Sequence, residues 1–397
     1  MAVQIVKPRI RGFICTNAHP AGCQANVNNQ IGKIKHGIPH KGTDMNALVI
    51  GASTGYGLAS RIALTYAYGA KTLGLLYERP ADDRRTASAG YYNTAAFHQQ
   101  AAADGFLAQS LNGDAFSNEM KTETIDRLKA DFGKIDTLVY SIAAPRRIHP
   151  DTGASHESVL KPIGVPYRGK TIDLSREVIA PVTIEPANEQ EIADTIAVMG
   201  GEDLEMWVDA LADADLLAPE MTVVAYTYIG SSLTWPIYRD GTIGRAKDDL
   251  KARVDALDQR LADQLGGNAY ISVNKAVVTQ ASAAIPVVPL YISILYDIMD
   301  AKGVNEAPIG QMRRLFSEHL GPGLQPQLDS ERYIRLDDRE LQPEITDAVT
   351  ERWAQIDTDN FHELSDYAGY RRRFRNLFGF EVEGVDYDEA VETELEF

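Results

Sequence analysis

The chain has 397 residues, of which 44% are hydrophobic and 24% charged, the balance of an ordinary folded protein with a substantial core. Its formal net charge of −17 argues against nucleic acid and anionic membranes as partners. Cys15 and Cys23 fit no zinc spacing, and the first residues lack a signal-peptide core, so we expect a cytoplasmic protein without a metal site.

The first 45 residues are predicted to form an N-terminal extension that packs on the core. Val3–Val6 and Ile10–Cys15 have the composition of short strands. Asn26–Ile34 is weakly helical, and His36–Asp44 contains the glycine, proline and histidine residues of a loop.

A strand, a glycine-rich turn and a helix follow. Ala47–Ile50 is an apolar, β-branched run typical of a buried parallel strand. Gly51, Gly55 and Gly57 come next, and apolar residues then recur at helical spacing. This layout directs free helix N–H groups at a diphosphate, and glycine lets the backbone approach the phosphate oxygens. The turn is therefore predicted to bind a dinucleotide, although a tight turn without a ligand is the alternative.

The next predicted strand, Lys71–Tyr77, ends in Glu78. This acid lies about 20 residues past the last glycine, where dinucleotide sites place a ribose-binding carboxylate. A solvated strand end is the other interpretation of Glu78, and the adjacent Arg79 would suit a 2′-phosphate. The spacing G-x-x-x-G-x-G resembles that of the short-chain dehydrogenase/reductase type of Rossmann fold.

Strands and helices continue to alternate through residue 145. Helices are predicted at Asn93–Asp104 and Asn118–Phe132, and strands at Gly105–Asn112 and Ile135–Ile142. This alternation predicts an α/β fold with a doubly wound parallel sheet, of which residues 46–145 form the nucleotide-binding half.

Residues 146–220 interrupt the alternation. They contain a proline- and glycine-rich segment with a strand-like run at Val178–Ile184, then helical patterns at Glu189–Met199 and Glu202–Ala214. The segment is long for a crossover connection, so we expect an insertion that covers the active site.

The catalytic half of the sheet is predicted at residues 221–303, and a helical C-terminal extension at residues 304–397, all in one compact unit. The most apolar stretch, residues 281–299, contains two prolines and an aspartate, and is expected to be a buried helix pair rather than a membrane span. The remaining predicted elements of this half are the strand Met221–Tyr228, the helix Gly244–Leu265 and the strand Asn268–Val273.

A tyrosine and a lysine stand where short-chain reductases carry their catalytic pair. Tyr238 and Lys247 are nine residues apart, which on one continuous helix would leave them on opposite sides. They can converge only if Tyr238 precedes the helix and Lys247 lies near its start. Gly241 and Gly244 permit such a break.

With this Tyr-x8-Lys spacing, the chain resembles the long, single-chain trans-2-enoyl reductases of the FabV type, over nearly its whole length. Independent motifs carry the resemblance in the same order: Lys7–Cys15, His19-Pro20, Gly22-Cys23, Gly51–Arg61, Asn112–Phe116, Pro150–Gly153, Gly200–Asp203, Ser272–Lys275 and Ala368–Arg371.

The resemblance implies an oxidoreductase of fatty acid biosynthesis that reduces trans-2-enoyl-CoA or enoyl-ACP with NADH, with acyl carrier protein as a candidate partner and a monomeric state. It assigns Tyr238 as proton donor, Lys247 as its cofactor-binding partner, and Tyr228 as a substrate contact. The residues implied to hold NADH are Gly51, Ala52, Ser53, Thr54, Gly55, Tyr56, Tyr77, Glu78, Asp114, Ala115, Ile142, Ala143, Lys247, Val277, Val278 and Thr279.

Other interpretations remain open at this point. Asp114 could be a turn residue of Asn-Gly-Asp, and Tyr226 is expected in the core. The basic run 371–375 is usually a helix face paired with acids, and a dock for substrate phosphate or acidic acyl carrier protein is the alternative. A carbonyl or 3-ketoacyl reductase of the same fold is the alternative enzyme, but this chain has Thr227 and Tyr228 where such enzymes offer a serine. A nucleotide-sensing regulator without catalysis is the third hypothesis.

Overall fold

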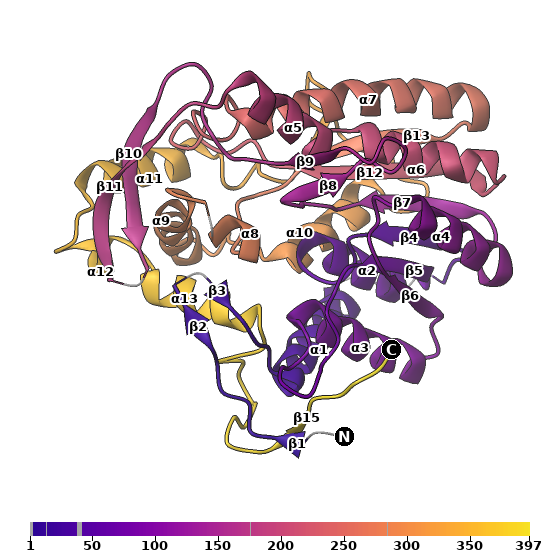
Figure 1. The fold of residues 1–397 in the computed structure, drawn as a ribbon, viewed down its shortest axis with the longest axis horizontal. Coiled ribbons are helices and arrows are strands. Elements are labelled where there is room, and N and C mark those ends of the chain that lie inside the picture. Colours follow the sequence, from indigo (N-terminus) through magenta and orange to yellow (C-terminus); the bar gives the residue numbers. More distant parts are fainter. Residues whose placement is uncertain (1–2, 13, 38–41, 175, 284) are drawn as a thin grey trace.

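The structure is a computed structural model that describes residues 3–12, 14–37, 42–174, 176–283 and 285–397. Its centre is a seven-stranded sheet in the order β14-β13-β12-β7-β4-β5-β6, with all neighbouring strands parallel (Figure 1). The strands are β4 (Asn46–Ile50), β5 (Lys71–Leu76), β6 (Ala108–Asn112), β7 (Ile135–Tyr140), β12 (Leu217–Thr227), β13 (Asn268–Val273) and β14 (Tyr333–Arg335). This order confirms the predicted doubly wound sheet. From β4 the chain adds β5 and β6 on one side and then β7, β12, β13 and β14 on the other, so the strand order switches between β4 and β7, where such sheets bind ligands.

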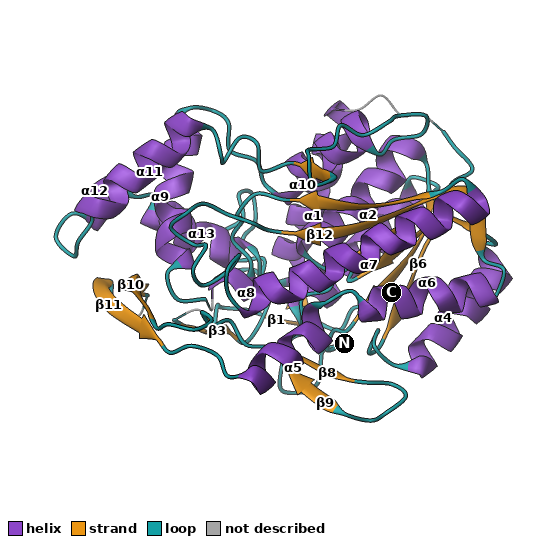
Figure 2. Cartoon of the chain, turned by 90° about the horizontal axis from the view of Figure 1, so that it is seen from above, coloured by secondary structure: helices purple, strands orange, loops and turns teal. Residues whose placement is uncertain are grey.

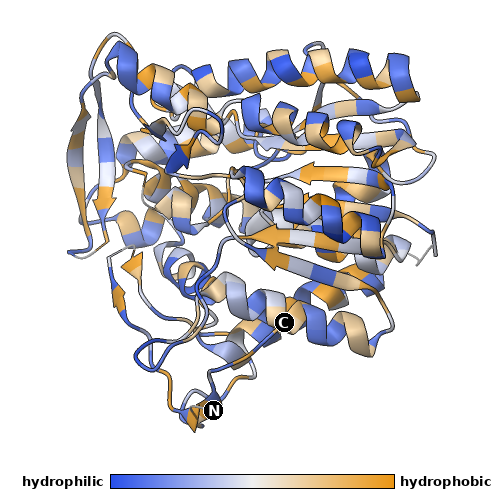
Figure 3. Cartoon of the chain, turned by 45° about the vertical axis from the view of Figure 1, so that its right-hand side comes forward, coloured by the Kyte–Doolittle hydropathy of each residue, from blue (hydrophilic) through white to orange (hydrophobic). Residues whose placement is uncertain are grey.

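Helices cover both faces of the sheet (Figure 2). Along β4, Ala47 and Val49 face one layer whereas Leu48 and Ile50 face the other, as the two-residue period of a strand requires. In Figure 3 the strands are largely hydrophobic, while the outer helices alternate hydrophobic and hydrophilic residues. The first layer contains α1 (Pro20–Gly37), α2 (Gly55–Tyr68), α3 (Ala89–Ala103), α10 (Pro308–Arg314) and the π-helix η1 (Leu315–His319); the second contains α4 (Asn118–Asp131), α6 (Glu202–Asp213) and α7 (Thr242–Leu265).

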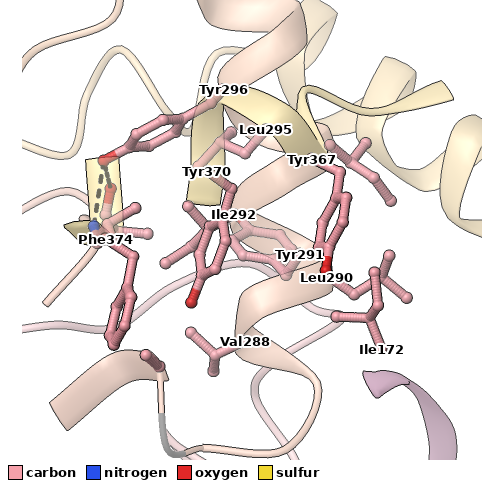
Figure 4. Packing of buried hydrophobic residues seen from close by; sticks show 14 of the residues in the cluster. Ile172, Val288, Leu290, Tyr291, Ile292, Leu295, Tyr296, Tyr367, Tyr370 and Phe374 are labelled. Carbon is pink, nitrogen blue, oxygen red and sulfur yellow. Dashed lines mark hydrogen bonds between the residues drawn. The ribbon is translucent and has the colours of Figure 1, made fainter. Parts of the chain in front are cut away.

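A third apolar cluster lies outside the two sheet layers. It is built on α9 (Val288–Ala301), with α11 (Pro343–Gln355) and α13 (Tyr367–Asn376) packed against it (Figure 4). The antiparallel ribbon of β10 (Tyr167–Asp173) and β11 (Val178–Ile184) flanks α9 (Figure 1). The remaining short elements are β8 (Arg146–Ile148), β9 (Ser155–Glu157), α5 (Glu189–Met199), α8 (Gln280–Ala283) and α12 (Phe361–Leu364).

Two short strands near the ends of the chain pair with each other. β1 (Val3–Gln4) pairs with β15 (Val391–Glu392), and β2 (Ile10–Arg11) forms a hairpin with β3 (Ile14–Cys15) (Figure 1). Helix α1 packs against α2 and α3. The N-terminal segment thus contributes directly to one helical layer of the sheet.

The structure differs from the sequence predictions at several elements. The predicted single strand Ile10–Cys15 is a hairpin, because Gly12 turns the chain with φ +59°; Phe13 lies outside the described residues. The strand predicted from Gly105 begins only at Ala108, because Gly105 has φ +81° in a turn. The predicted helix Asn26–Ile34 is the longer α1, and of the predicted loop His36–Asp44, residues 38–41 are not described. The C-terminal extension is helical, as predicted, and it also supplies the short strands β14 and β15.

Candidate active site

The predicted site residues follow the carboxyl ends of the strands. Because these strands are parallel, the segments after β4, β5, β6, β7, β12 and β13 all emerge at one edge of the sheet. They are, in chain order, 51–56, 77–78, 114–115, 142–143, 228 and 277–279. Residues scattered over more than two hundred positions of sequence are therefore gathered at the place where doubly wound sheets bind nucleotides.

The glycine turn leaves the start of α2 open. Gly55 has φ +54°, and a Cβ atom on it would meet no protein atom within 4 Å. The N-cap residue Thr54 makes no side-chain hydrogen bond to the first turn of the helix. The N–H groups of that turn and the positive end of the helix dipole are thus available to an anion.

Glu78 is held in place by the neighbouring strand ends. Its Oε1 accepts a hydrogen bond from the Ser53 hydroxyl at 2.7 Å. Its backbone N–H donates to Asn112 Oδ1, and its carbonyl accepts from Asn112 Nδ2, both at 2.8 Å. Asn112 was not among the predicted site residues, although its place at the end of β6 is the signal that could have identified it. The adjacent Tyr77 is 81% exposed, so its ring is free to stack on a flat ligand.

The loop after β6 is fixed by the insertion. Asp114 Oδ1 accepts from the Phe116 N–H at 3.0 Å, which is the turn role expected for an aspartate here. The carbonyl of Ala115 accepts from Trp207 Nε1 of α6 at 3.1 Å and from Lys121 Nζ at 3.3 Å. Lys121 is buried and paired with Asp203 of α6 at 2.8 Å. Helix α6 of the insertion therefore anchors the loop after β6.

The Tyr238–Lys247 pair has the arrangement that its spacing demands. Helix α7 begins at Thr242, so Tyr238 precedes it and Lys247 lies in its second turn. The carbonyl of Tyr238 accepts hydrogen bonds from the N–H groups of Gly241 at 3.2 Å and Gly244 at 3.0 Å. These bonds attach the turn that carries Tyr238 to the first turn of α7. A Cβ atom on Gly244 would lie 1.7 Å from the carbonyl oxygen of Arg239, so only glycine permits this contact.

Both side chains of the pair are half-buried, and no described residue forms a hydrogen bond or ion pair with the Tyr238 hydroxyl or the Lys247 ammonium. Burial raises the pKa of the Tyr238 hydroxyl to about 12 and lowers the pKa of Lys247 to about 8. At neutral pH the Tyr238 phenol keeps its proton, and the Lys247 ammonium is partly desolvated. A tyrosine and a lysine in this condition can donate to, and attract, an anionic or anion-forming group.

Tyr228 lies beside Tyr238, with ring centroids 5.0 Å apart and the rings nearly perpendicular. Its hydroxyl donates to Glu340 Oε1 at 3.2 Å, and Glu340 is fully buried. Sequence reasoning missed Glu340, because it stands in a run of acidic and basic residues that looks like solvated surface. Tyr226, expected in the core, packs against α2 and shares a 2.6 Å hydrogen bond with the Ser60 hydroxyl.

The segment after β13 borders α9. Val277 and Val278 are buried, and the Val278 N–H donates to the Tyr296 hydroxyl at 3.3 Å. Thr279 is fixed by reciprocal 2.9 Å hydrogen bonds with Ser282. After β7, Ile142 is half-buried and Ala143 is exposed, so both can face a ligand.

Other groups considered in the sequence have structural roles. The basic run on α13 is paired with acids: Arg371 with Glu177, Arg373 with Asp300 and Asp366, and Arg375 with Glu381. Within the described ranges, no three His, Cys, Asp or Glu side chains form a group suited to a metal ion. The helices in that part of the chain include none that is long and apolar enough to cross a membrane.

Comparison with known proteins matches the whole chain. Residues 5–83 match the family described as the NAD(P)H binding domain of trans-2-enoyl-CoA reductase, residues 85–320 the trans-2-enoyl-CoA reductase catalytic region, and residues 328–391 the enoyl reductase FAD binding domain. The chain is 52% identical to the enoyl-[acyl-carrier-protein] reductase [NADH] of Opitutus terrae, covering 98% of this chain and 99% of that protein. It is 51% identical to the trans-2-enoyl-CoA reductase [NADH] of Ruminiclostridium cellulolyticum, covering 98% of each.

A solved structure supports the same relationship. The crystal structure of Clostridium acetobutulicum trans-2-enoyl-CoA reductase in complex with NADH superimposes with a TM-score of 0.95 at 43% identity, covering 98% of each chain. The sheet order, the insertion and the C-terminal helices of the present chain are therefore features of a shared architecture.

The segment matched to a flavin-binding family does not fit a flavin. Residues 328–391 contain one short strand of the sheet, β14, and the helices α11 to α13, without a glycine-rich turn between a strand and a helix. The cavity beside this segment, lined by Tyr370, Arg371, Phe374 and Arg375, has a volume of 150 Å³. Pockets for ligands of cofactor size typically measure about 300–1,000 Å³, and the arginines are already paired with Glu177 and Glu381.

Proposed function

Because the chain belongs to the trans-2-enoyl-CoA reductase family, we propose that it reduces the C2=C3 double bond of trans-2-enoyl thioesters with NADH in fatty acid biosynthesis. The observation that carries the proposal is the Tyr238–Lys247 pair. Both polar groups lack partners among the described residues, and Tyr228 and the predicted cofactor loops lie at the same edge of the sheet.

The chain's residues fit a dinucleotide along this edge. The open start of α2, with residues 51–56, would hold the diphosphate, and Glu78 would accept hydrogen bonds from the adenosine ribose. Tyr77, with Asp114 and Ala115, would border the adenine. Residues 142–143 and 277–279 would line the nicotinamide side, and Lys247 would bind its ribose. Bound NADH would supply the hydride that reaches C3 of the substrate.

Glu78 and its neighbours support NADH rather than NADPH. The carboxylate is fixed by Ser53 and would repel a 2′-phosphate. The neighbouring Arg79 guanidinium donates one hydrogen bond, to the Thr86 carbonyl at 2.9 Å, within its own loop.

The catalytic chemistry follows from where charge develops. Hydride addition at C3 places negative charge on the thioester oxygen as an enolate. The Tyr238 hydroxyl would donate a hydrogen bond to this oxygen, while the Lys247 ammonium would favour the negative charge. Partial burial strengthens both interactions, since a less polar environment screens the developing charge less than water does. C2 then takes a proton from Tyr238 or from solvent.

One assay tests the function against its alternatives. Loss of NADH absorbance is followed with crotonyl-CoA, a long-chain enoyl-CoA, an enoyl-ACP and a 3-ketoacyl-CoA. Oxidation of NADH by the enoyl thioesters alone supports the proposal. Oxidation by the ketoacyl thioester alone would indicate the 3-ketoacyl reductase, and no oxidation with any substrate would indicate a nucleotide-binding regulator.

The proposal includes the setting in which the enzyme works. Relatives are named for acyl carrier protein and for coenzyme A thioesters, so either carrier suits the substrate class. We propose a cytoplasmic monomer, in keeping with two buried, unpaired thiols and with terminal strands that pair within one chain. Size-exclusion chromatography with light scattering tests the monomer, and a pull-down with acyl carrier protein tests that partner.

A further inference from the structure

A buried carboxylate lies directly behind the proposed substrate contact. Glu340 has no exposed surface and accepts three hydrogen bonds. Tyr228 and Tyr291 donate their hydroxyls to Oε1 at 3.2 Å and 2.7 Å, and the backbone N–H of Ala276 donates to Oε2 at 2.7 Å. A carboxylate that accepts several hydrogen bonds is held in one orientation and holds its donors in turn.

A buried ammonium holds the carbonyl of the same residue, Ala276. Lys275 Nζ donates to the Ala276 carbonyl at 2.6 Å and lies 4.2 Å from the centre of the Tyr296 ring. The Lys275 carbonyl accepts from the Tyr56 hydroxyl at 2.8 Å, which links this peptide to the first turn of α2. Glu340 and Lys275 thus fix Ala276 from its N–H and its carbonyl, immediately before residues 277–279.

The three donors come from different elements. Tyr228 follows β12, Ala276 follows β13, and Tyr291 belongs to α9 of the third apolar cluster (Figure 4). Glu340 itself comes from the C-terminal extension, shortly after β14. One carboxylate therefore contacts Tyr228 on the proposed substrate side and Ala276, which precedes the residues of the proposed nicotinamide side.

Accordingly, we propose that Glu340 is a positioning residue of the active site, acting through Tyr228 and through the peptide at Ala276. This inference rests on the proposed enoyl reduction. A carboxylate can only accept hydrogen bonds, so the Tyr228 hydroxyl donates its one hydrogen bond to Glu340. The Tyr228 oxygen then remains available only as an acceptor. Of the two tyrosines, Tyr238 is then the one that donates to the thioester oxygen.

A double-mutant cycle tests whether Glu340 acts through Tyr228. The variants Tyr228→Phe, Glu340→Gln and the double variant are compared by kcat and KM for crotonyl-CoA at saturating NADH. We expect each single variant to raise KM about tenfold, because a positioning contact is lost in each. The increase of KM in the double variant should be smaller than the product of the two single increases by about fivefold or more, because the effects of contacting residues are not additive. Losses that multiply to within twofold would overturn the proposal.

A matched control separates positioning from stability. Glu306 is also a buried carboxylate, 8% exposed, but it pairs with Arg314 at 3.0 Å and Arg339 at 3.3 Å. Glu306→Gln should lower the unfolding temperature while leaving KM for crotonyl-CoA unchanged. An equal rise of KM in Glu306→Gln would show that Glu340 acts only through stability, and would overturn the proposal.

Two further arms keep the test decisive. If Glu340→Gln does not fold, Glu340→Asp enters the same cycle, because it keeps the charge but is too short to reach Tyr228 and Ala276 together. The same criterion of non-additivity then applies. A wild-type protein that does not oxidise NADH with crotonyl-CoA would instead refute the proposed function, before any variant is compared.

Discussion

Gly244→Ala should misplace Tyr238 without touching the cofactor loops. The new Cβ would lie 1.7 Å from the Arg239 carbonyl oxygen, where an ordinary contact begins at 3.4 Å. Relieving the overlap requires the turn that carries Tyr238 to move by on the order of 1.5 Å, because the helix is packed and cannot yield. Since a misplacement of about 1 Å can cost about 10²-fold in rate, we expect kcat to fall about 100-fold. Overpacking should also cost about 1–3 kcal/mol in the free energy of unfolding.

The control is a glycine-to-alanine variant at a position where the added Cβ atom meets no other atom. Gly32 lies within α1, and a Cβ atom there would meet nothing within 4 Å. Gly32→Ala should leave kcat unchanged and stabilise the fold by about 0.5–1 kcal/mol, the usual gain inside a helix. Turnover with crotonyl-CoA, NADH titration and thermal unfolding are measured for both. A Gly244→Ala variant with wild-type kcat would refute the argument that this contact sets the position of Tyr238.

Changes at four residues separate the roles of the remaining site residues. Tyr238→Phe should lower kcat about 10²-fold with little change in NADH affinity, since it removes an interaction of the transition state. Tyr228→Phe should act mainly on KM for the thioester; equal effects of both tyrosine variants on KM alone would contradict this division. Lys247→Met should weaken NADH binding and lower kcat, and Lys247→Arg should not restore kcat, because a planar guanidinium cannot replace a compact ammonium. Burial lowers the pKa of Lys247 to about 8, so NADH affinity and kcat of the wild type should fall as the pH rises through 8 and the ammonium is lost. That decline should be absent from Lys247→Arg, and its persistence there would assign it to another group. Glu78→Ala should lower kcat/KM for NADH and reduce the preference for NADH over NADPH. The prediction fails if the wild type already has a higher kcat/KM with NADPH.

Elements with a strong local pattern were predictable from the sequence. The strand Asn268–Val273 and the helix Glu189–Met199 have their predicted bounds, because each is a compact apolar or periodic run between clear turn residues. β14 was missed because its three residues, Tyr333–Arg335, lie between charged loops and pair with β13 alone at the sheet edge. Such a strand is stabilised by pairing with its neighbour, and no local sequence pattern predicts it.

The site shows the same division. The spacing of Tyr238 and Lys247 required a helix that starts between them, and α7 does start there, at Thr242. Glu340 could not be found in this way. Its neighbours are charged, and only the folded chain brings it to Tyr228 and excludes water from its carboxylate. Local chemistry identifies the groups that react, whereas the groups that position them depend on tertiary contacts.

The C-terminal extension has a physical reason to be part of this site. When a tyrosine and a lysine lie four residues apart on one helix, the helix itself fixes their relative position. Here Tyr238 lies in an irregular turn before α7, so the regular geometry of the helix does not set its position. The Gly244 contact supplies one constraint, and Tyr228, edge-on to the Tyr238 ring and bonded to Glu340, supplies a second. On the proposed role of Glu340, a residue of the extension thus stabilises the arrangement that regular helix geometry cannot provide.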